Sequence, residues 1–331
     1  MTGHPSQYST QKSVLATFEC PVIAIVGPTA SGKSSLAQSI ALKLDGEVVS
    51  ADSMQVYRGM DIGTAKLLAA ERKVPHHLID IIDPGQAYSA QLFQNHARSA
   101  FIDIYERGKV PILCGGTGFY VQAALEDMRF PDGEQEENPL RDSLEAFRLA
   151  KGNEALWDLL NERDPASAAL IHHNNFIRVI RALEMYEGGI SYADQAENIR
   201  TLPEAVWSLR FLIQVDPLVL AQRINERVDT MRSAGLVTEV ESLIEQGFEE
   251  ALTAPKAIGY KEIIAAKRGV VTLDRAFEQI KTATRRYAKR QRSWFRRDGR
   301  LNILDADRLT EEEMAALVCD QYREALASRI R

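Results

Sequence analysis

The sequence reads Gly27-Pro28-Thr29-Ala30-Ser31-Gly32-Lys33-Ser34 directly after the apolar run 22–26 and before a helical pattern that continues to about residue 44. This octapeptide matches G-x-x-x-x-G-K-[ST], the phosphate-loop pattern, in the strand-to-helix context that the pattern requires. In such a loop, successive backbone N–H groups and the positive end of the helix face a phosphate. We therefore expect residues 27–34 to bind a diphosphate or triphosphate, with the Lys33 ammonium on its oxygens and the Ser34 hydroxyl on Mg²⁺.

Further short apolar runs predict a parallel sheet around this loop. Residues 47–50 and 109–114 have the pattern of buried strands, and a strand pattern returns at residues 209–215. Because helical patterns alternate with these strands, the expected fold is α/β, a P-loop NTPase-like parallel sheet flanked by helices. The carboxyl ends of the strands then share one edge, where such sheets bind ligands. The later helices are expected at residues 217–234, 237–246, 260–267 and 273–297.

The composition of the chain predicts a core with one insertion. Residues 1–20 are polar, and we expect a flexible leader there. The acidic stretch PDGEQEENP opens a region that has helical patterns and no strand signal, so we expect an all-helical insertion domain over residues 131–199. Its helical segments are expected at residues 140–150, 153–163 and 176–186. The P-loop core then comprises residues 21–130 and 200–331, with a basic helix at 273–297.

The overall composition is that of a globular protein. Of the 331 residues, 45% are hydrophobic and 26% are charged, so the chain can bury a sizeable core. The apolar runs are of strand length, far below the roughly 18–20 residues that a membrane helix needs, and we expect no membrane span. The three cysteines are widely spaced and form no CxxC pair, which argues against a zinc or disulfide framework. We therefore expect a cytoplasmic protein.

The charge of the chain is distributed unevenly. The net charge is −6, yet residues 281–300 contain nine Lys or Arg and one Asp, a local charge of +8 that leaves −14 for the rest. A basic stripe on an acidic body indicates a directed site for a polyanion. The alternative is a solvated helix face without a partner.

Several further segments resemble one enzyme family. Residues 50–66 read SADSMQVYRGMDIGTAK and strongly resemble the bacterial tRNA dimethylallyltransferases, the tRNA isopentenyltransferases of the IPP transferase family. The resemblance covers almost the whole chain after residue 20. Family members usually have Pro where this chain has Leu67 and His173, and often a basic residue where it has Ile177. The matching segments continue with VPHHLID (74–80), GGTGFY (115–120), RVIRALE (178–184), AIGYKE (257–262), YAKRQ (287–291) and WFR (294–296).

The resemblance implies a reaction and its substrates. Enzymes of this family transfer the dimethylallyl group of dimethylallyl diphosphate to N6 of the adenosine at tRNA position 37, just 3′ of the anticodon, and release diphosphate. The partners implied are the anticodon stem-loop of tRNA, dimethylallyl diphosphate and Mg²⁺. We expect a monomer that does not associate with membranes.

The resemblance also implies catalytic roles. Asp52 is the expected general base for the N6 proton, while Thr117 and Arg227 contact the diphosphate together with Lys33. A carboxylate suits the first task because the N6 lone pair is delocalised and N6 is a poor nucleophile. Hydrogen-bond donors suit the diphosphate contacts because negative charge grows on the bridging oxygen as diphosphate leaves. From the residues alone, Asp52 could instead cap a helix or bridge a metal, and Thr117 could close a turn.

Expected tRNA contacts fall in three groups. The target base must be flipped out of a stacked loop, and the resemblance places Asp52, Ser53, Met54, Gln55 and Thr117 around it. The resemblance adds two segments, Ile177-Arg178-Val179-Ile180-Arg181 and Ala257-Ile258-Gly259-Tyr260-Lys261-Glu262. In the basic helix, i+4 and i+3 spacing places four cations on one face. These four are Arg285, Lys289, Arg292 and Arg296.

Other functions remain open from the residues alone. A P-loop kinase would use an acidic residue after an apolar run, and both 48–52 and 77–83 fit that pattern. A prenyltransferase for free adenine nucleotides would need neither the insertion nor the basic helix. A non-enzymatic RNA-binding module would have no use for the phosphate loop. The pairs His76-His77 and His172-His173 lack metal-ligand spacing, so we expect structural roles for them.

Overall fold

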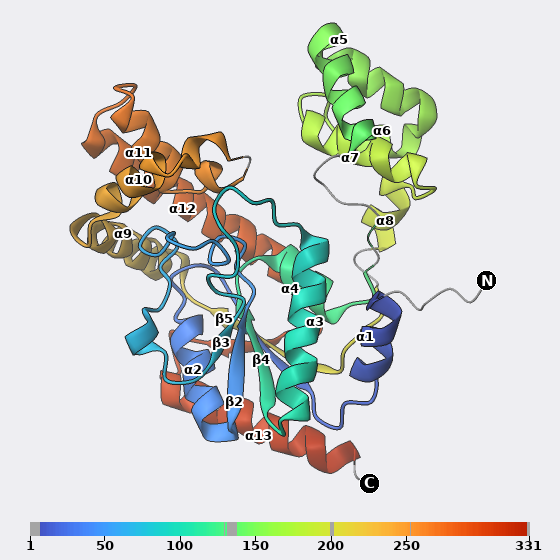
Figure 1. Cartoon of the computed structure of the whole chain (residues 1–331). Coiled ribbons are helices and arrows are strands. Elements are labelled where there is room, and N and C mark those ends of the chain that lie inside the picture. The colour runs from blue at the N-terminus through green and yellow to red at the C-terminus, as the bar shows by residue number, and fades with distance from the viewer. Residues whose placement is uncertain (1–6, 129, 131–137, 199–201, 252, 330–331) are drawn as a thin grey trace. The chain divides into compact units, whose positions relative to one another are not determined.

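The computed structural model describes residues 7–128, 130, 138–198, 202–251 and 253–329. They fall into two compact units (Figure 1). The core unit spans Met1–Glu126 and Glu204–Arg331, and the insertion unit spans Asp127–Pro203. The insertion unit is slightly wider than the expected range 131–199. Most of the acidic stretch that opens the expected range, residues 131–137, lies outside the described residues.

The core unit is built on a six-stranded sheet in the order β3-β2-β4-β1-β5-β6. Every strand pair is parallel, as the sequence predicts. β1 at the centre pairs Ile25 with Cys114 of β4 and with Phe211 of β5. The carboxyl ends of β1, β2 and β4 therefore meet at one edge. The strands are β1 (Val22–Val26), β2 (Gly46–Ser50), β3 (His76–His77), β4 (Val110–Gly115), β5 (Ser208–Gln214) and β6 (Asn302–Asp305).

Helices cover both faces of this sheet because its strands are apolar on both. In β1, Val22, Ala24 and Val26 pack into one hydrophobic cluster, while Ile23 and Ile25 pack into another. The first cluster includes side chains of α3 and α4, and the second includes side chains of α2 and α13. The covering helices are α2 (Lys33–Leu44), α3 (Ala90–Glu106), α4 (Gly118–Leu125) and α13 (Glu311–Arg329).

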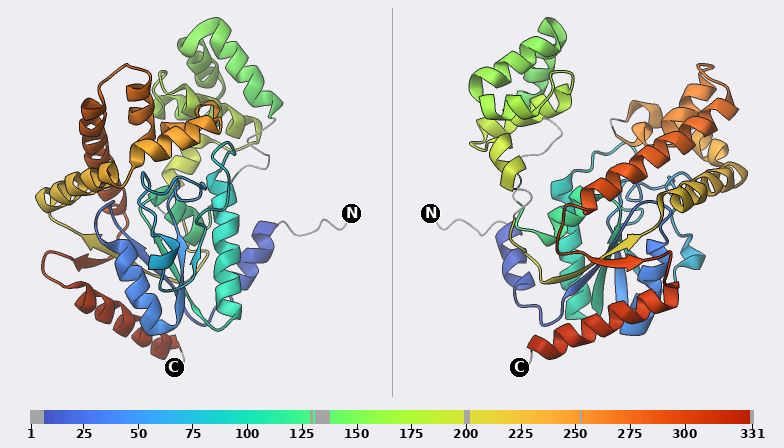
Figure 2. Two further views of the ribbon diagram at one scale, coloured as in Figure 1. Left: turned by 60° about the vertical axis from the view of Figure 1, so that its left-hand side comes forward. Right: turned by 180° about the vertical axis from the view of Figure 1, so that it is seen from behind.

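Four helices gather beyond the carboxyl ends of the strands (Figures 1 and 2). α12 contacts α9, α11 and α4, so it joins this group to the sheet. The group contains α9 (Pro217–Ser233), α10 (Leu236–Glu245), α11 (Tyr260–Lys267) and α12 (Leu273–Phe295). Three short 3₁₀ turns, η1 (Ala69–Glu71), η2 (Phe248–Glu250) and η3 (Ala254–Lys256), lie in the connecting segments.

The expectation of a flexible leader over residues 1–20 is wrong for its described part. Residues Gln7–Leu15 form α1, which contacts α3. The Phe18 ring stacks on Tyr105 with centroids 4.1 Å apart, and Gln11 Nε2 donates to the Asn95 carbonyl. Leu15 and Phe18 are both buried. Burial of these two apolar side chains in the first cluster fixes the segment in place. Because most of residues 1–20 are polar, the overall composition does not indicate this burial.

The insertion unit is helical throughout its described part, as expected. It consists of α5 (Pro139–Arg163), α6 (Pro165–Leu170), α7 (Phe176–Glu187) and α8 (Tyr192–Asn198). α5 covers two of the expected helices, which meet at Gly152, a residue with φ of 90° inside the helix. Leu144 and Leu156 of α5 pack with Val179 and Leu183 of α7 in a separate apolar core. No helix among the described residues is long and apolar enough to cross a membrane.

Candidate active site

The phosphate loop has the backbone that anion binding requires. Gly32 adopts φ of 90° and Ala30 φ of 63°, so the chain turns tightly before α2 begins at Lys33. No side chain in the described part of the protein caps α2, so its first-turn N–H groups form a site of positive potential at the loop. Lys33 Nζ donates to the Pro28 carbonyl at 3.2 Å, which folds the ammonium back over the loop.

A second glycine-rich turn follows β4 beside this loop. The backbone N–H of Thr117 donates to the Ala51 carbonyl at 3.2 Å, and Thr117 Oγ1 accepts from the Ser53 N–H at 3.2 Å. These two bonds tie the ends of β4 and β2 together. Gly115 is required here because a Cβ at this position would lie 2.2 Å from the Ala51 carbonyl oxygen.

Asp52 comes directly after β2, between the two turns. Its Oδ1 accepts from the Met54 N–H at 2.9 Å, which fixes the carboxylate in an Asx turn. The carboxylate interacts electrostatically with both Lys33 and Arg227. Burial lowers the pKa of the Lys33 ammonium, and the negative charge of Asp52 offsets part of that shift. Asp52 therefore lies within the field of both cations.

Arg227 reaches the site from α9, far away in sequence. Its Nη1 donates to Thr29 Oγ1 of the phosphate loop at 3.3 Å. Burial lowers the pKa of its guanidinium, and the Asp52 carboxylate counteracts this. The structure thus brings together Lys33, Asp52, Thr117 and Arg227, the four residues to which the family resemblance assigns catalytic roles.

α12 supplies two side chains to the site, Gln291 and Trp294, that the sequence did not indicate. Gln291 Oε1 accepts from the Thr29 N–H at 2.9 Å, and Gln291 Nε2 donates to the Gly116 carbonyl at 2.9 Å. The Trp294 ring covers Gly118, where a Cβ would lie 2.1 Å from the ring atom Cδ1. The segment YAKRQ carries family resemblance, but nothing in its spacing indicates which side chain turns inward.

A partly buried hydrogen-bond network supports the segment expected to surround the target base. Gln55 Nε2 donates to the Thr64 carbonyl at 3.3 Å, and Ser50 Oγ donates to Gln55 Oε1 at 3.0 Å. The Glu239 carboxylate of α10 accepts from the backbone N–H groups of residues 61, 62 and 63. It also accepts from the Tyr260 hydroxyl at 2.7 Å. Glu239 has no counterpart among the sequence-predicted residues.

The segment Ala257–Glu262 is largely inside the protein. Tyr260 is fully buried and lies against Gly63, where a Cβ would be 2.5 Å from its ring. Ala257 and Glu262 are also buried. Ile258 is half-buried, and the Lys261 side chain is 51% exposed. Of this expected tRNA-binding segment, Lys261 is the side chain most open to a partner.

The two acidic stretches that fit the pattern of a P-loop kinase, residues 48–52 and 77–83, have different surroundings in the structure. Residues 48–52 end beside the phosphate loop. The other stretch contains Asp80, which pairs with the buried Lys66, and Asp83, which pairs with Arg58 at 2.8 Å. Lys66 also donates to Asp61 Oδ1 at 2.8 Å. The second stretch therefore holds a loop together and lies apart from the phosphate loop's own contacts.

The basic face of α12 differs in detail from the predicted one. Lys289 and Arg296 are exposed, as are Arg286, Arg290 and Arg297, while Arg292 is half-buried. Among the described residues none of these six cations forms an ion pair. Arg285 differs from them, because its guanidinium donates to Asn225 Oδ1 of α9 and to Thr282 Oγ1.

In the insertion unit, α7 presents part of the expected segment to solvent. Ile177 is 64% exposed and Arg178 is exposed, while Arg181 is half-buried and pairs with Glu184 at 3.5 Å. Val179 and Ile180 belong to the apolar core of the unit. This change from exposed to buried side chains along α7 follows from the 3.6-residue helical repeat.

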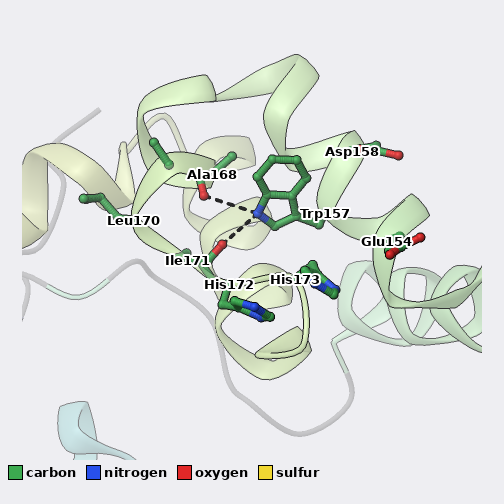
Figure 3. A pocket seen from close by; sticks show the side chains of 9 residues that line it. Glu154, Trp157, Asp158, Ala168, Leu170, Ile171, His172 and His173 are labelled. Carbon is green, nitrogen blue, oxygen red and sulfur yellow. Dashed lines mark hydrogen bonds between the residues drawn. The ribbon is translucent and has the colours of Figure 1, made fainter.

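The two histidine pairs have different surroundings. His77 Nε2 lies 2.7 Å from the buried Glu47, and His76 Nδ1 lies 2.9 Å from the Val74 carbonyl. The rings of His172 and His173 stack at 4.3 Å and line an open pocket of about 630 Å³ in the insertion unit (Figure 3). The Trp157 indole N–H beside them donates to two backbone carbonyls. The described residues contain no group of three or more His, Cys, Asp or Glu that could hold a metal.

A parallel α/β sheet that ends in a phosphate loop, a carboxylate and a second glycine-rich turn defines a P-loop phosphate-binding protein. The family model described as IPP transferase matches residues 55–298, and the model described as isopentenyl transferase matches residues 20–76. The chain belongs to the IPP transferase family.

Individual relatives extend this likeness to most of the chain. A tRNA dimethylallyltransferase of Carboxydothermus hydrogenoformans is 46% identical over 295 residues, which cover 88% of this chain and 94% of the relative. The crystal structure of a full-length tRNA isopentenylpyrophosphate transferase from Bacillus halodurans is 39% identical, with a TM-score of 0.68, and covers 94% of this chain and 99% of that one. A eukaryotic dimethylallyltransferase acting on tRNA is 30% identical, with a TM-score of 0.73, and covers 87% of this chain and 74% of that one.

Proposed function

We propose that this protein transfers the dimethylallyl group of dimethylallyl diphosphate to N6 of the adenosine at tRNA position 37 and releases diphosphate. The observation that carries the proposal is the convergence of Lys33, Asp52, Thr117 and Arg227 at one sheet edge. One group can accept a proton there, and the others can receive a departing diphosphate. Names of the relatives support the choice of tRNA as acceptor.

Asp52 acts as the general base in this reaction. The N6 nitrogen forms a bond to the terminal CH₂ carbon of the dimethylallyl group, while the bond from that carbon to the diphosphate oxygen breaks. The proton that N6 loses goes to the Asp52 carboxylate. The Asx turn with the Met54 N–H holds the carboxylate in place and leaves its second oxygen for the proton.

The leaving diphosphate is stabilised by donors that are already in place. The phosphate-loop N–H groups and Lys33 hold its oxygens, Arg227 approaches from the Thr29 side, and Thr117 donates from the second turn. The buried Ser31 hydroxyl has no partner among the described residues, which fits a loop shaped around an oxyanion. The hydroxyl of Ser34 is a hard donor of the kind that Mg²⁺ prefers. Bound there, Mg²⁺ would neutralise charge on the diphosphate.

The tRNA is held by exposed cations. The unpaired basic side chains of α12 contact backbone phosphates, and Lys261 contributes from α11. Arg178 and Arg181 of α7 contact the RNA from the insertion unit. Asp52, Ser53, Met54 and Gln55 receive the flipped adenine. We expect the protein to act as a cytoplasmic monomer, with one active site in each chain.

A transfer assay tests this proposal. The protein should move label from labelled dimethylallyl diphosphate into unmodified tRNA in the presence of Mg²⁺, and excess chelator should stop the transfer. AMP offered in place of tRNA should take up no label, and ATP should not be consumed. Label on AMP with none on tRNA would indicate a nucleotide prenyltransferase. ATP consumption without transfer to tRNA would indicate a kinase.

A further inference from the structure

We infer that Gln291 is a positioning residue that fixes the phosphate loop and the Gly115–Gly118 turn in a single geometry around the diphosphate. The inference rests on the proposed function and extends it to a residue outside both turns. Gln291 lies on α12, one helical turn from Tyr287 and beside the exposed basic face. It is buried, although α12 is polar over most of its length.

Both ends of the Gln291 amide are used, and each holds a different turn. The carbonyl oxygen Oε1 accepts from the Thr29 N–H at 2.9 Å, and the amide Nε2 donates to the Gly116 carbonyl at 2.9 Å. Thr29 lies in the phosphate loop and also receives the Arg227 guanidinium on its hydroxyl. Gly116 directly precedes Thr117. One side chain therefore links the phosphate loop, which holds Lys33, to the turn that holds Thr117.

The chemistry of this position selects glutamine. The site needs an acceptor for an N–H group and a donor for a carbonyl group, and a neutral amide supplies both on one planar head. A carboxylate lacks the donor, and an ammonium lacks the acceptor. The absence of a side chain at Gly116 completes the fit, because a Cβ there would lie 2.2 Å from Gln291 Nε2. The two residues therefore form a matched pair across 175 positions of sequence.

Precise placement of these donors matters because catalysis depends on groups held where charge develops. Without Gln291 the Thr29 N–H and the Gly116 carbonyl lose their partner, and the two turns can shift independently. A displacement of about 1 Å at a reacting centre can cost roughly 100-fold in rate. Gln291 itself contacts neither the dimethylallyl group nor the adenine in this account.

The test compares Gln291→Met, which keeps the length of the side chain and removes both hydrogen bonds, with the control Gln38→Met. Gln38 is also buried, and its Oε1 accepts from the Lys73 N–H at 2.7 Å, so this side-chain bond holds a segment outside both turns. Three quantities are measured for each full-length variant: the affinity for inorganic pyrophosphate with Mg²⁺, the affinity for unmodified tRNA, and the single-turnover transfer rate at saturating tRNA.

Gln291→Met should weaken pyrophosphate binding and lower the transfer rate, each by roughly 10- to 100-fold, with tRNA affinity within about twofold of wild type. Gln291→Glu should lose at least as much, because its carboxylate lacks the donor and adds negative charge. Gln38→Met should match wild type in all three quantities, even if both Met variants melt at similarly lowered temperatures. Wild-type pyrophosphate affinity in a folded Gln291→Met variant would overturn the inference. Failure of the wild-type protein to transfer to tRNA would instead overturn the proposed function.

Discussion

Two glycine-rich turns follow parallel strands at the same sheet edge, yet their glycines are needed for different reasons. Gly32 of the phosphate loop adopts φ of 90°, and no described atom lies within 4 Å of a Cβ placed there. In the second turn, Cβ atoms at Gly116 and Gly118 would lie 2.2 Å and 2.1 Å from Gln291 and Trp294 of α12. Gly32 is therefore needed for its backbone conformation, whereas Gly116 and Gly118 are needed because of their neighbours.

This difference explains why one turn is readable from the sequence and the other is not. A backbone requirement is local, so it produces a short motif with fixed spacing. A requirement for close approach depends on a helix about 175 residues away, and only the folded chain reveals that partner. Substitutions in and around each turn distinguish a local backbone requirement from a requirement set by a distant helix.

Lys33→Met should abolish transfer while tRNA affinity stays close to that of wild type. The Lys33 ammonium lies over the phosphate loop, bonded to the Pro28 carbonyl, and it contacts phosphate rather than RNA in this account. Single-turnover transfer and tRNA binding measured on the same preparation check this separation. Loss of tRNA binding in parallel with loss of rate, in a folded variant, would show that the loop is not a dedicated diphosphate site.

Asp52→Asn should slow the chemical step by roughly 10²- to 10⁴-fold, the usual range for a general base. The amide keeps an oxygen for the Met54 N–H but cannot take up the N6 proton. Pyrophosphate binding should survive, because Asp52 is not among its donors. A single-turnover rate within about threefold of wild type would remove Asp52 from the role of base.

Gly118→Ala should destabilise the fold by about 1–3 kcal/mol through overlap with the Trp294 ring, and most of this loss should disappear in a Trp294→Ala background. Gly32→Ala should cost about 1–2 kcal/mol through its left-handed backbone, whatever the neighbouring side chains. Urea unfolding of the single and double variants measures both. Equal losses for Gly118→Ala in the two backgrounds would contradict the steric explanation for the second turn.

The exposed cations of α12 have a smaller predicted effect. Lys289→Ala combined with Arg290→Ala should weaken tRNA binding and flatten the dependence of log affinity on log salt by about 0.7–0.9 for each phosphate that the protein no longer neutralises. Arg285→Ala is the matched control, since its guanidinium is bonded to Asn225 and Thr282. A salt slope unchanged in the double variant but reduced by Arg285→Ala would show that the RNA-binding role had been given to the wrong side chains.

Much of the core could be predicted because its signals are local. The strand at 22–26 and the helix at 260–267 have the predicted bounds, since continuous apolar residues and a preceding glycine mark them. Several elements have no predicted range, among them α1, α3, β3, β6 and α13. α13 buries Val318 and Tyr322 against the sheet but is polar over much of its length, so its periodic signal is weak.

The residues of the candidate site also fall into those that the sequence indicates and those that only the fold reveals. Lys33 and Ser34 follow from a motif, and the role of Asp52 follows from the family resemblance of residues 50–66. Gln291 and Glu239 could not be predicted, because each acts by hydrogen bonds to backbone groups of distant turns. Backbone partners leave no complementary residue type in the sequence, so neither spacing nor charge indicates them.

The sheet edge that holds Asp52, Lys33, Thr117 and Arg227 is proposed to prenylate one particular tRNA atom. The most direct measurement is mass-spectrometric mapping of the dimethylallyl group on an unmodified tRNA after nuclease digestion, beside the same tRNA with guanosine at position 37. We predict one dimethylallyl group on N6 of the adenosine 3′ of the anticodon, and none on the guanosine-containing tRNA. A dimethylallyl group at any other nucleotide, or equal incorporation into both tRNAs, would contradict the account.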